Sequence, residues 1–166
     1  MRYTVKGGNK LQQHIVYKTV DYIAPKLKLT RYPSLTIEYQ IKKINSSFHG
    51  FCSAESESHR VYKPRDFEVE LSKDLHLLDF VKTICHESIH VEQYVTGKIQ
   101  EDYSVGEKGR WVWKNRRVSL NTKYKDHPWE KEAFRKESKL AMEVLANVEF
   151  SLRLKLRNER GVKNGK

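Results

Sequence analysis

Cysteine, proline and long apolar runs are all scarce in this chain of 166 residues. Its two cysteines, Cys52 and Cys85, are too few for a disulfide framework, so we expect reduced thiols in a cytoplasmic setting. No apolar run approaches the length of about 20 residues that a membrane-spanning helix needs. Residues 1–4 have no apolar stretch after their basic residue, so we expect no secretory signal.

Acidic side chains are also few compared with basic ones. The 21 Asp and Glu residues stand against 32 Lys and Arg residues, which gives a formal net charge of +11 at pH 7. A surplus of this size attracts polyanions such as nucleic acid, although a basic surface can equally serve solubility alone. Charge by itself leaves both interpretations open.

The basic residues are densest between residues 108 and 125, where Trp111 and Trp113 are interleaved with them. Cationic groups beside aromatic rings suit single-stranded nucleic acid, because phosphates meet the cations and bases stack on the rings. The alternative is a solvated hairpin whose two tryptophans share one face and complete the core. We favour this alternative and keep nucleic acid as a second hypothesis for a partner.

The hydrophobic pattern predicts a single α+β domain over residues 1–166, with a basic flexible tail at about 158–166. Helical spacing covers residues 12–28, 75–96 and 128–157. Ser72 or Asp74 is expected to cap the middle helix and Gly97 to end it. Alternation predicts strands at 35–41, 48–54 and 60–71 and a hairpin at 104–120. One side of each strand is polar, so we expect a small antiparallel sheet with one wet face, packed with the helices.

The middle helix contains His86-Glu87-Ser88-Ile89-His90. Histidines four apart lie one turn apart on the same helix face and can bind one ion. Glu87 lies about 100° around the helix from His86, so its carboxylate can reach a water molecule on that ion without binding the ion. Two imidazoles and a carboxylate suit zinc, and a catalytic zinc keeps a fourth position open for water.

Polar side chains flank the two histidines on this helix, which predicts that both histidines face a polar groove. The flanking residues are Lys82, Thr83, Gln93 and Tyr94.

A third ligand has to come from outside this helix. A metzincin would have glycine at position 93 and histidine at position 96, but the chain has Gln93 and Thr96. On the next helix, Glu130 shares a mostly apolar, inward-facing row, whereas Glu132 shares a charged and solvated row. We therefore expect Glu130 to be the ligand and Glu132 to be a surface charge. His127 competes for the same role, and Glu130 could instead cap its helix.

The segment HESIHVEQYVTGKI, followed by HPWEKEAF, resembles small HExxH zinc metallopeptidases of phage and bacterial genomes. The resemblance covers about residues 76–140. These metallopeptidases are similar to the gluzincin type of zincin and overlap with SprT-like proteins. The resemblance implies a zincin-like fold and, for a phage protein, the host cytoplasm. It also implies zinc bound by His86, His90 and Glu130, with Glu87 in catalysis.

The chain departs from gluzincins at Phe134, where that type often has an acidic residue or asparagine four residues after the third ligand. Metal-binding histidines normally donate their second ring N–H to a neighbouring group. Another residue has to provide this support here, and Glu137 is a candidate.

These observations lead to the hypothesis of protein or peptide hydrolysis by metal-activated water, with Glu87 moving the proton from water to the leaving amine. Tyr124 and His127 could donate a hydrogen bond to the developing oxyanion. An exposed sheet edge, taken as residues 66–71, could bind an extended peptide. One alternative is a DNA-associated, SprT-like protein that binds nucleic acid through its basic surface. Another is a structural zinc domain without catalysis, with both Glu130 and His127 bound.

Overall fold

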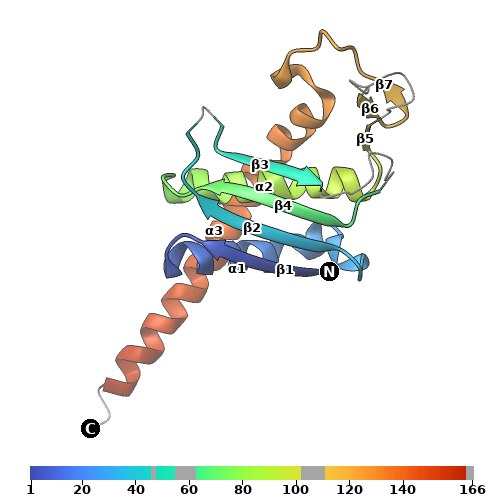
Figure 1. Ribbon diagram of the computed structural model, residues 1–166. Helices are drawn as coiled ribbons and strands as arrows, with labels where there is room; N and C mark the ends of the chain where they lie inside the picture. The colour runs from blue at the N-terminus through green and yellow to red at the C-terminus, as the bar shows by residue number, and fades with distance from the viewer. Residues whose placement is uncertain (46–47, 55–62, 102–110, 164–166) are drawn as a thin grey trace.

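The computed structural model describes residues 1–45, 48–54, 63–101 and 111–163, with side chains as far as residue 147. These residues form an α+β fold, as expected, with a larger and a smaller sheet (Figure 1). The helices are α1 (Lys10–Lys26), α2 (Leu77–Val95) and α3 (Pro128–Lys163). The larger sheet contains β1 (Arg2–Gly7), β2 (Thr36–Lys42), β3 (Gly50–Ala54) and β4 (Asp66–Ser72). The smaller sheet contains β5 (Ile99–Glu101), β6 (Trp111–Trp113) and β7 (Arg116–Arg117), and short 3-10 turns lie at η1 (Leu29–Arg31) and η3 (Tyr124–Asp126).

The larger sheet is mixed, so the prediction of an antiparallel sheet is wrong. Its order is β1-β2-β4-β3, with β1, β2 and β4 parallel and only β3 antiparallel to its neighbour. Burial alternates along β2 and β4, which confirms the expected wet face. Alternation shows which face is buried but not which way the neighbouring strand runs. Strand β1 was not predicted, and α1 is the helical crossover that lets β1 and β2 run parallel.

Helices α1 and α2 cover one face of the larger sheet, and α3 packs against both of them (Figure 1). The core lies between this face and the two helices. Its fully buried members include Val20 of α1, Tyr39 of β2, Val69 of β4 and Ile84 of α2. The outer face of α2 is therefore left for α3, and the first turns of α3 lie over it.

The middle helix begins and ends close to the predicted positions. Its N-terminal cap is His76, which makes no side-chain capping bond, so the prediction of Ser72 or Asp74 is wrong. Ser72 instead ends β4 and is buried. Gly97 follows the helix with a φ of 75°, a left-handed conformation that glycine adopts easily, as predicted for the helix end.

The last helix begins at Pro128, as predicted, and continues to Lys163, beyond the expected end at residue 157. Its C-terminal part projects away from the rest of the fold (Figure 1). Of the predicted hairpin, residues 104–110 lie outside the described residues. The described part turns between β6 and β7 at Lys114 and Asn115, both of which have positive φ values. Among the described helices, none is both long and apolar enough to cross a bilayer.

Candidate metal centre

Helix α2 brings two imidazoles together one turn apart. The Nε2 atoms of His86 and His90 lie 3.0 Å apart, and the two residues are only 8 % and 7 % exposed. Ser88 lies on the opposite side of the helix and hydrogen-bonds to Tyr39 of β2 at 2.8 Å. This buried bond sets the rotation of α2, so the histidines face away from the sheet and towards α3.

The third group is Glu130, which lies in the first turn of α3 and is 2 % exposed. Its carboxylate oxygens lie 3.2 Å from Nε2 of His86 and 3.4 Å from Nε2 of His90. The ligand atoms of these three residues all lie within 4.8 Å of one another, so the group could hold one metal ion. Within the described part of the chain, His127 and Glu132 are not members of such a group. Of the three candidates for the third position, the structure brings Glu130 to the histidines.

Outer hydrogen bonds determine which nitrogen of each ring faces the centre. Nδ1 of His86 lies 2.7 Å from a Glu137 oxygen, and Nδ1 of His90 lies 2.8 Å from Oε1 of Gln93. Both oxygens accept, so each Nδ1 donates a proton and, in the neutral form of each ring, Nε2 carries the lone pair. In that form the two Nε2 atoms, 3.0 Å apart, both face a common point where a cation could bind. The prediction that Glu137 supports a ligand histidine agrees with its contact.

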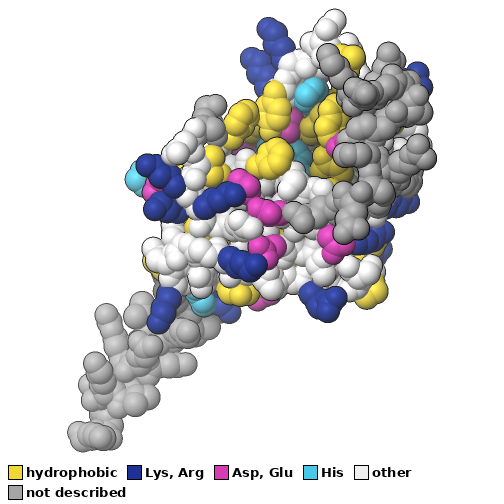
Figure 2. All heavy atoms as spheres, in the orientation of Figure 1, with side chains coloured by type: hydrophobic (Ala, Val, Ile, Leu, Met, Phe, Trp, Pro, Cys, Tyr) yellow, Lys and Arg dark blue, Asp and Glu magenta, His cyan; other side chains and the backbone are white. Residues whose placement is uncertain are grey.

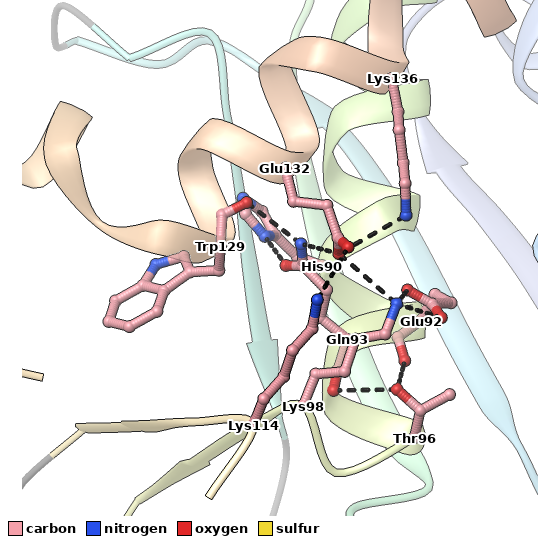
Figure 3. Close-up of polar contacts among 9 residues, drawn as sticks. All are labelled: His90, Glu92, Gln93, Thr96, Lys98, Lys114, Trp129, Glu132 and Lys136. Carbon is pink, nitrogen blue, oxygen red and sulfur yellow. Dashed lines mark hydrogen bonds and ion pairs between the residues drawn. The ribbon is translucent and has the colours of Figure 1, made fainter. Parts of the chain in front are cut away.

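Gln93 is fully buried and connects His90 to a charged network (Figure 3). Its Nε2 donates to Glu132 at 3.0 Å and to the backbone carbonyl of Trp129 at 3.1 Å, which turns Oε1 towards His90. Three lysine ammonium groups surround Glu132 in the same view. They belong to Lys98 at 3.4 Å, Lys114 at 3.4 Å and Lys136 at 3.5 Å. The network therefore holds the amide of Gln93 in the orientation that His90 requires.

Two predictions are corrected by this network: Gln93 is not part of a groove wall, and Glu132 is not a solvated surface charge. Burial would raise the pKa of Glu132, but the hydrogen bond from Gln93 and the nearby lysines lower it to about 2. Within the charged row of α3, Glu132 is covered because Lys98 and Lys114, which flank strands β5 and β6, reach across to it. Periodicity within one helix cannot show that a distant hairpin will pack there.

Replacing Gln93 with leucine should weaken metal binding by about 10- to 100-fold, the usual cost of losing an outer partner of a metal-binding histidine. Leucine preserves the volume but leaves Nδ1 of His90 without an acceptor. The measurement is competition with a chromophoric zinc chelator. Gln40→Leu, on the wet face of the larger sheet, is the control and should bind zinc like the parent. Equal affinity in all three proteins would show that Gln93 does not position His90.

The charges of the group are unusual for buried residues. Burial would lower the pKa of His86, but hydrogen bonds to Glu130 and Glu137 outweigh it and raise the pKa to about 10. Burial would raise the pKa of Glu130, but hydrogen bonds to both histidines lower it to about 2. The centre is therefore a place where carboxylates stabilise positive charge, as a metal-binding site requires.

Glu87 lies beside this group but outside it, on the side of α2 that approaches β3. A Cβ atom added to Gly50 of β3 would lie 2.9 Å from Oε1 of Glu87 and 2.6 Å from Cγ2 of Thr83, so strand and helix are in close contact there. Burial raises the pKa of Glu87, and the charges of His90 and His86 partly oppose this shift. A carboxylate with a raised pKa is a stronger base, which suits the role predicted for Glu87.

Two hollows meet at Glu87. The larger has a volume of about 590 Å3 and lies on the His90 side, and the smaller has about 300 Å3 and lies on the His86 side. Both are lined by Phe48, Gly50, Glu87 and Tyr124, so together they form one groove across the centre. Figure 2 shows hydrophobic side chains gathered around acidic and histidine side chains in this region.

The two predicted transition-state donors, Tyr124 and His127, both line the larger hollow. The pKa of Tyr124 is raised by burial, by the charge of Glu130 and by a hydrogen bond to it, which places the phenol beside the carboxylate of the group. The ring of His127 stacks on Trp129, with centroids 4.3 Å apart and an interplanar angle of 27°. Both residues are therefore within the groove, and their catalytic roles stay predictions.

The two tryptophans of the basic segment are engaged in packing. Trp111 and Trp113 place their rings 5.4 Å and 6.5 Å from that of Trp129, as the alternative of a core-completing hairpin face expected. Lys114 of the same segment contacts Glu132. Part of the local positive charge thus has a partner inside the protein, and binding of nucleic acid stays a prediction.

The sheet edge next to the groove is β3, so the prediction of residues 66–71 as the edge is wrong. Those residues belong to β4, which lies between β2 and β3. No strand in the described part of the chain pairs with the outer side of β3. The amide of Ser72 donates to the carbonyl of His49, and antiparallel pairs alternate, so Gly50, Cys52 and Ala54 direct their backbone N–H and C=O groups away from β4.

The arrangement contains two imidazole nitrogens and one carboxylate around a common point, a separate basic carboxylate, and a groove beside a strand edge with no partner among the described strands. These parts can bind a divalent cation and present a carbonyl group to it. No protein-family model, no curated protein and no solved structure matches this chain.

Proposed function

We propose that this protein is a zinc-dependent peptidase of the gluzincin type, with His86, His90 and Glu130 as ligands and Glu87 as the general base. The observation that supports the proposal most strongly is the convergence of both Nε2 atoms on the buried carboxylate of Glu130, with Glu87 adjacent. Two imidazoles and one carboxylate form the ligand set of several catalytic zinc sites. Neutral imidazole with carboxylate also suits zinc better than magnesium or calcium, which prefer oxygen ligands.

A bound zinc ion would lower the pKa of a coordinated water to about 7 and polarise a carbonyl group. The chain's own residues perform the remaining tasks. Glu87 accepts the proton of the attacking water and delivers it to the leaving amine. The hydroxyl of Tyr124, which is held at the groove next to Glu130, donates to the oxygen that becomes negative.

A peptide is the substrate that best suits the groove. The backbone groups of Gly50, Cys52 and Ala54 on the outer side of β3 can form the hydrogen bonds of an added strand. A peptide strand added to the outer side of β3 runs along the groove and past Glu87, because Gly50 lines the groove and lies against the side chain of Glu87. The backbone of an extended peptide is thereby held while one of its carbonyl groups faces the centre.

The non-catalytic alternative has less support. A closed structural site would need a fourth protein ligand, for which His127 was the candidate. The ring of His127 stacks on Trp129 instead, and the ion-binding group found within the described residues consists of His86, His90 and Glu130. Three protein ligands would leave one position of a tetrahedral zinc ion for solvent, as in catalytic zinc sites.

Removal of the metal should abolish hydrolysis. We expect a synthetic peptide library, followed by mass spectrometry, to be cleaved by the zinc-loaded protein, to remain intact after treatment with a chelator, and to be cleaved again when one equivalent of zinc is returned. The chelator-treated protein should keep its helical circular dichroism signal, which separates loss of chemistry from unfolding. Cleavage that continues at full rate in excess chelator would contradict a metal-dependent mechanism.

A further inference from the structure

We propose that the larger hollow binds a bulky aromatic side chain of the substrate residue on the N-terminal side of the cleaved bond. This inference rests on the proposed peptidase function and adds a substrate class to it. It depends on the composition of the hollow and on the direction in which β3 passes the centre.

Eight of the sixteen residues that line the larger hollow carry rings, and the carboxylates of Glu87, Glu101 and Glu130 lie beside them. Trp111, Trp129 and Tyr124 come from the smaller sheet, the start of α3 and the turn before it, and Phe48 closes the side next to the smaller hollow. The rings support one another, since Trp111 lies 5.4 Å from Trp129 and Phe48 lies 5.5 Å from Tyr124. A cavity of about 590 Å3 is large enough for an aromatic side chain, and offset or edge-to-face contacts with its walls would stabilise a ring.

The smaller hollow has a different character. Its walls include Asp79, Lys82 and Glu137, and its volume of about 300 Å3 is about half that of the larger one. An aromatic side chain placed there would meet fewer rings than in the larger hollow and would lie beside charged groups of both signs that need their hydration, so the two hollows discriminate between substrate residues. The ring belongs in the larger hollow, on the His90 side of Glu87.

The direction of β3 assigns the larger hollow to one side of the cleaved bond. His49, just before the strand, lines the smaller hollow, whereas Cys52 and Ala54 line the larger one, so β3 runs from the smaller to the larger hollow. A peptide that pairs antiparallel with β3, the more stable of the two pairings, runs the opposite way. Its N-terminal part therefore lies in the larger hollow and its C-terminal part in the smaller.

Two hydroxamates test this assignment without requiring turnover. N-acetyl-phenylalanine hydroxamate and N-acetyl-alanine hydroxamate both place their side chain on the N-terminal side of the metal-binding group. We expect zinc-loaded protein to bind the phenylalanine compound at least about 10-fold more tightly by calorimetry, because the ring leaves water only in that complex. Library cleavage should show the same preference for aromatic residues before the cleaved bond.

A pair of variants on one strand locates the preference. Trp111→Ala should reduce the ratio of the two affinities to less than about 3-fold, and Trp111→Phe should restore most of it. Trp113→Ala is the matched control, because Trp113 also packs on Trp129 but does not line the hollow. The control should retain the ratio of the parent.

The outcomes separate the two proposals. Equal affinity for both hydroxamates, or an aromatic preference only after the cleaved bond, would overturn the assignment while the peptidase function stands. Failure of both hydroxamates to bind zinc-loaded protein would overturn it as well, since the hollow would then not adjoin an accessible metal. If Trp111→Ala does not fold, the ratio of the two hydroxamate affinities in the parent protein still tests the assignment of the larger hollow.

Discussion

Glu87→Gln should abolish peptide hydrolysis and leave zinc binding intact. Glutamine keeps the shape of the side chain but cannot accept the proton of the attacking water. General-base catalysis contributes about 10²- to 10⁴-fold, so we expect a loss of at least that size in kcat/KM. Zinc content, measured by inductively coupled plasma mass spectrometry, should stay at the level of the parent because Glu87 lies outside the metal-binding group.

The control for this variant is Glu38→Gln on the wet face of the larger sheet, where Glu38 pairs with Lys6. It removes the same charge far from the groove and should keep both activity and zinc. Hydrolysis by Glu87→Gln at more than about a tenth of the parent rate would assign the proton transfer to another group. Loss of zinc together with activity would instead show that Glu87 belongs to the ligand set.

Glu130→Gln should reduce zinc affinity by more than about 100-fold, and activity at limiting zinc should fall with it. An outer partner of a ligand costs about 10- to 100-fold, and removal of a direct ligand costs more. Glu130 is 2 % exposed and both imidazoles face it, so its replacement removes the anionic partner that the two rings share. Competition with a chromophoric chelator measures the affinity.

Two other glutamates on α3, Glu132 beside the centre and Glu143 farther along the helix, provide the comparison. Glu143→Gln removes an ion pair with Lys26 on α1 and should leave zinc affinity unchanged. Glu132→Gln weakens the hold on Gln93 and should have an intermediate effect. The expected order of affinity is therefore parent, Glu132→Gln, Glu130→Gln. A Glu130→Gln protein that binds zinc as tightly as the parent would identify a different third ligand.

The residues of the centre were predictable where local geometry decides. The spacing of His86 and His90 on one helix face follows from the helical period alone. The choice of Glu130 over Glu132 followed from which row of α3 is apolar, and the structure places Glu130 against the histidines. The 40 or so residues between the histidines and Glu130 did not prevent this prediction, because a charged side chain on a buried helix face is almost always paired with another group.

The predictions that were wrong concern the pairing of strands that are distant from one another in the sequence. Strands β2 and β4 alternate as expected, but their parallel pairing depends on β3, which lies between them in the chain and pairs with the far side of β4. The parallel pairing of β1 with β2 depends on α1 and on a first strand whose pattern is weak. The same uncertainty put the free edge on residues 66–71, although the hydrogen bonds of β4 are used on both sides. Strand order is a property of the whole sheet and is not written in any one segment.

The hydrogen-bond and ion-pair network around Gln93 and Glu132 could not be predicted from the sequence for another reason. Gln93 appears polar and exposed when the helix is considered alone, and Glu132 shares a row with charged residues. Their roles arise only when the smaller sheet brings Lys98 and Lys114 over the start of α3. A glutamine close to a histidine motif nevertheless indicates a candidate outer partner of a ligand, since a metal-binding histidine needs an acceptor for its second N–H.

X-ray absorption spectroscopy at the zinc edge on the zinc-loaded protein tests the central claim most directly. We predict one zinc per chain, two imidazole nitrogens at about 2.0–2.1 Å, carboxylate or water oxygen at about 2.0–2.2 Å, and no sulfur scatterer. The Glu130→Gln protein, loaded at high zinc, should lose oxygen scattering and keep both imidazoles. A sulfur shell at about 2.3 Å, fewer than two imidazoles, or no stoichiometric zinc would contradict the centre described here.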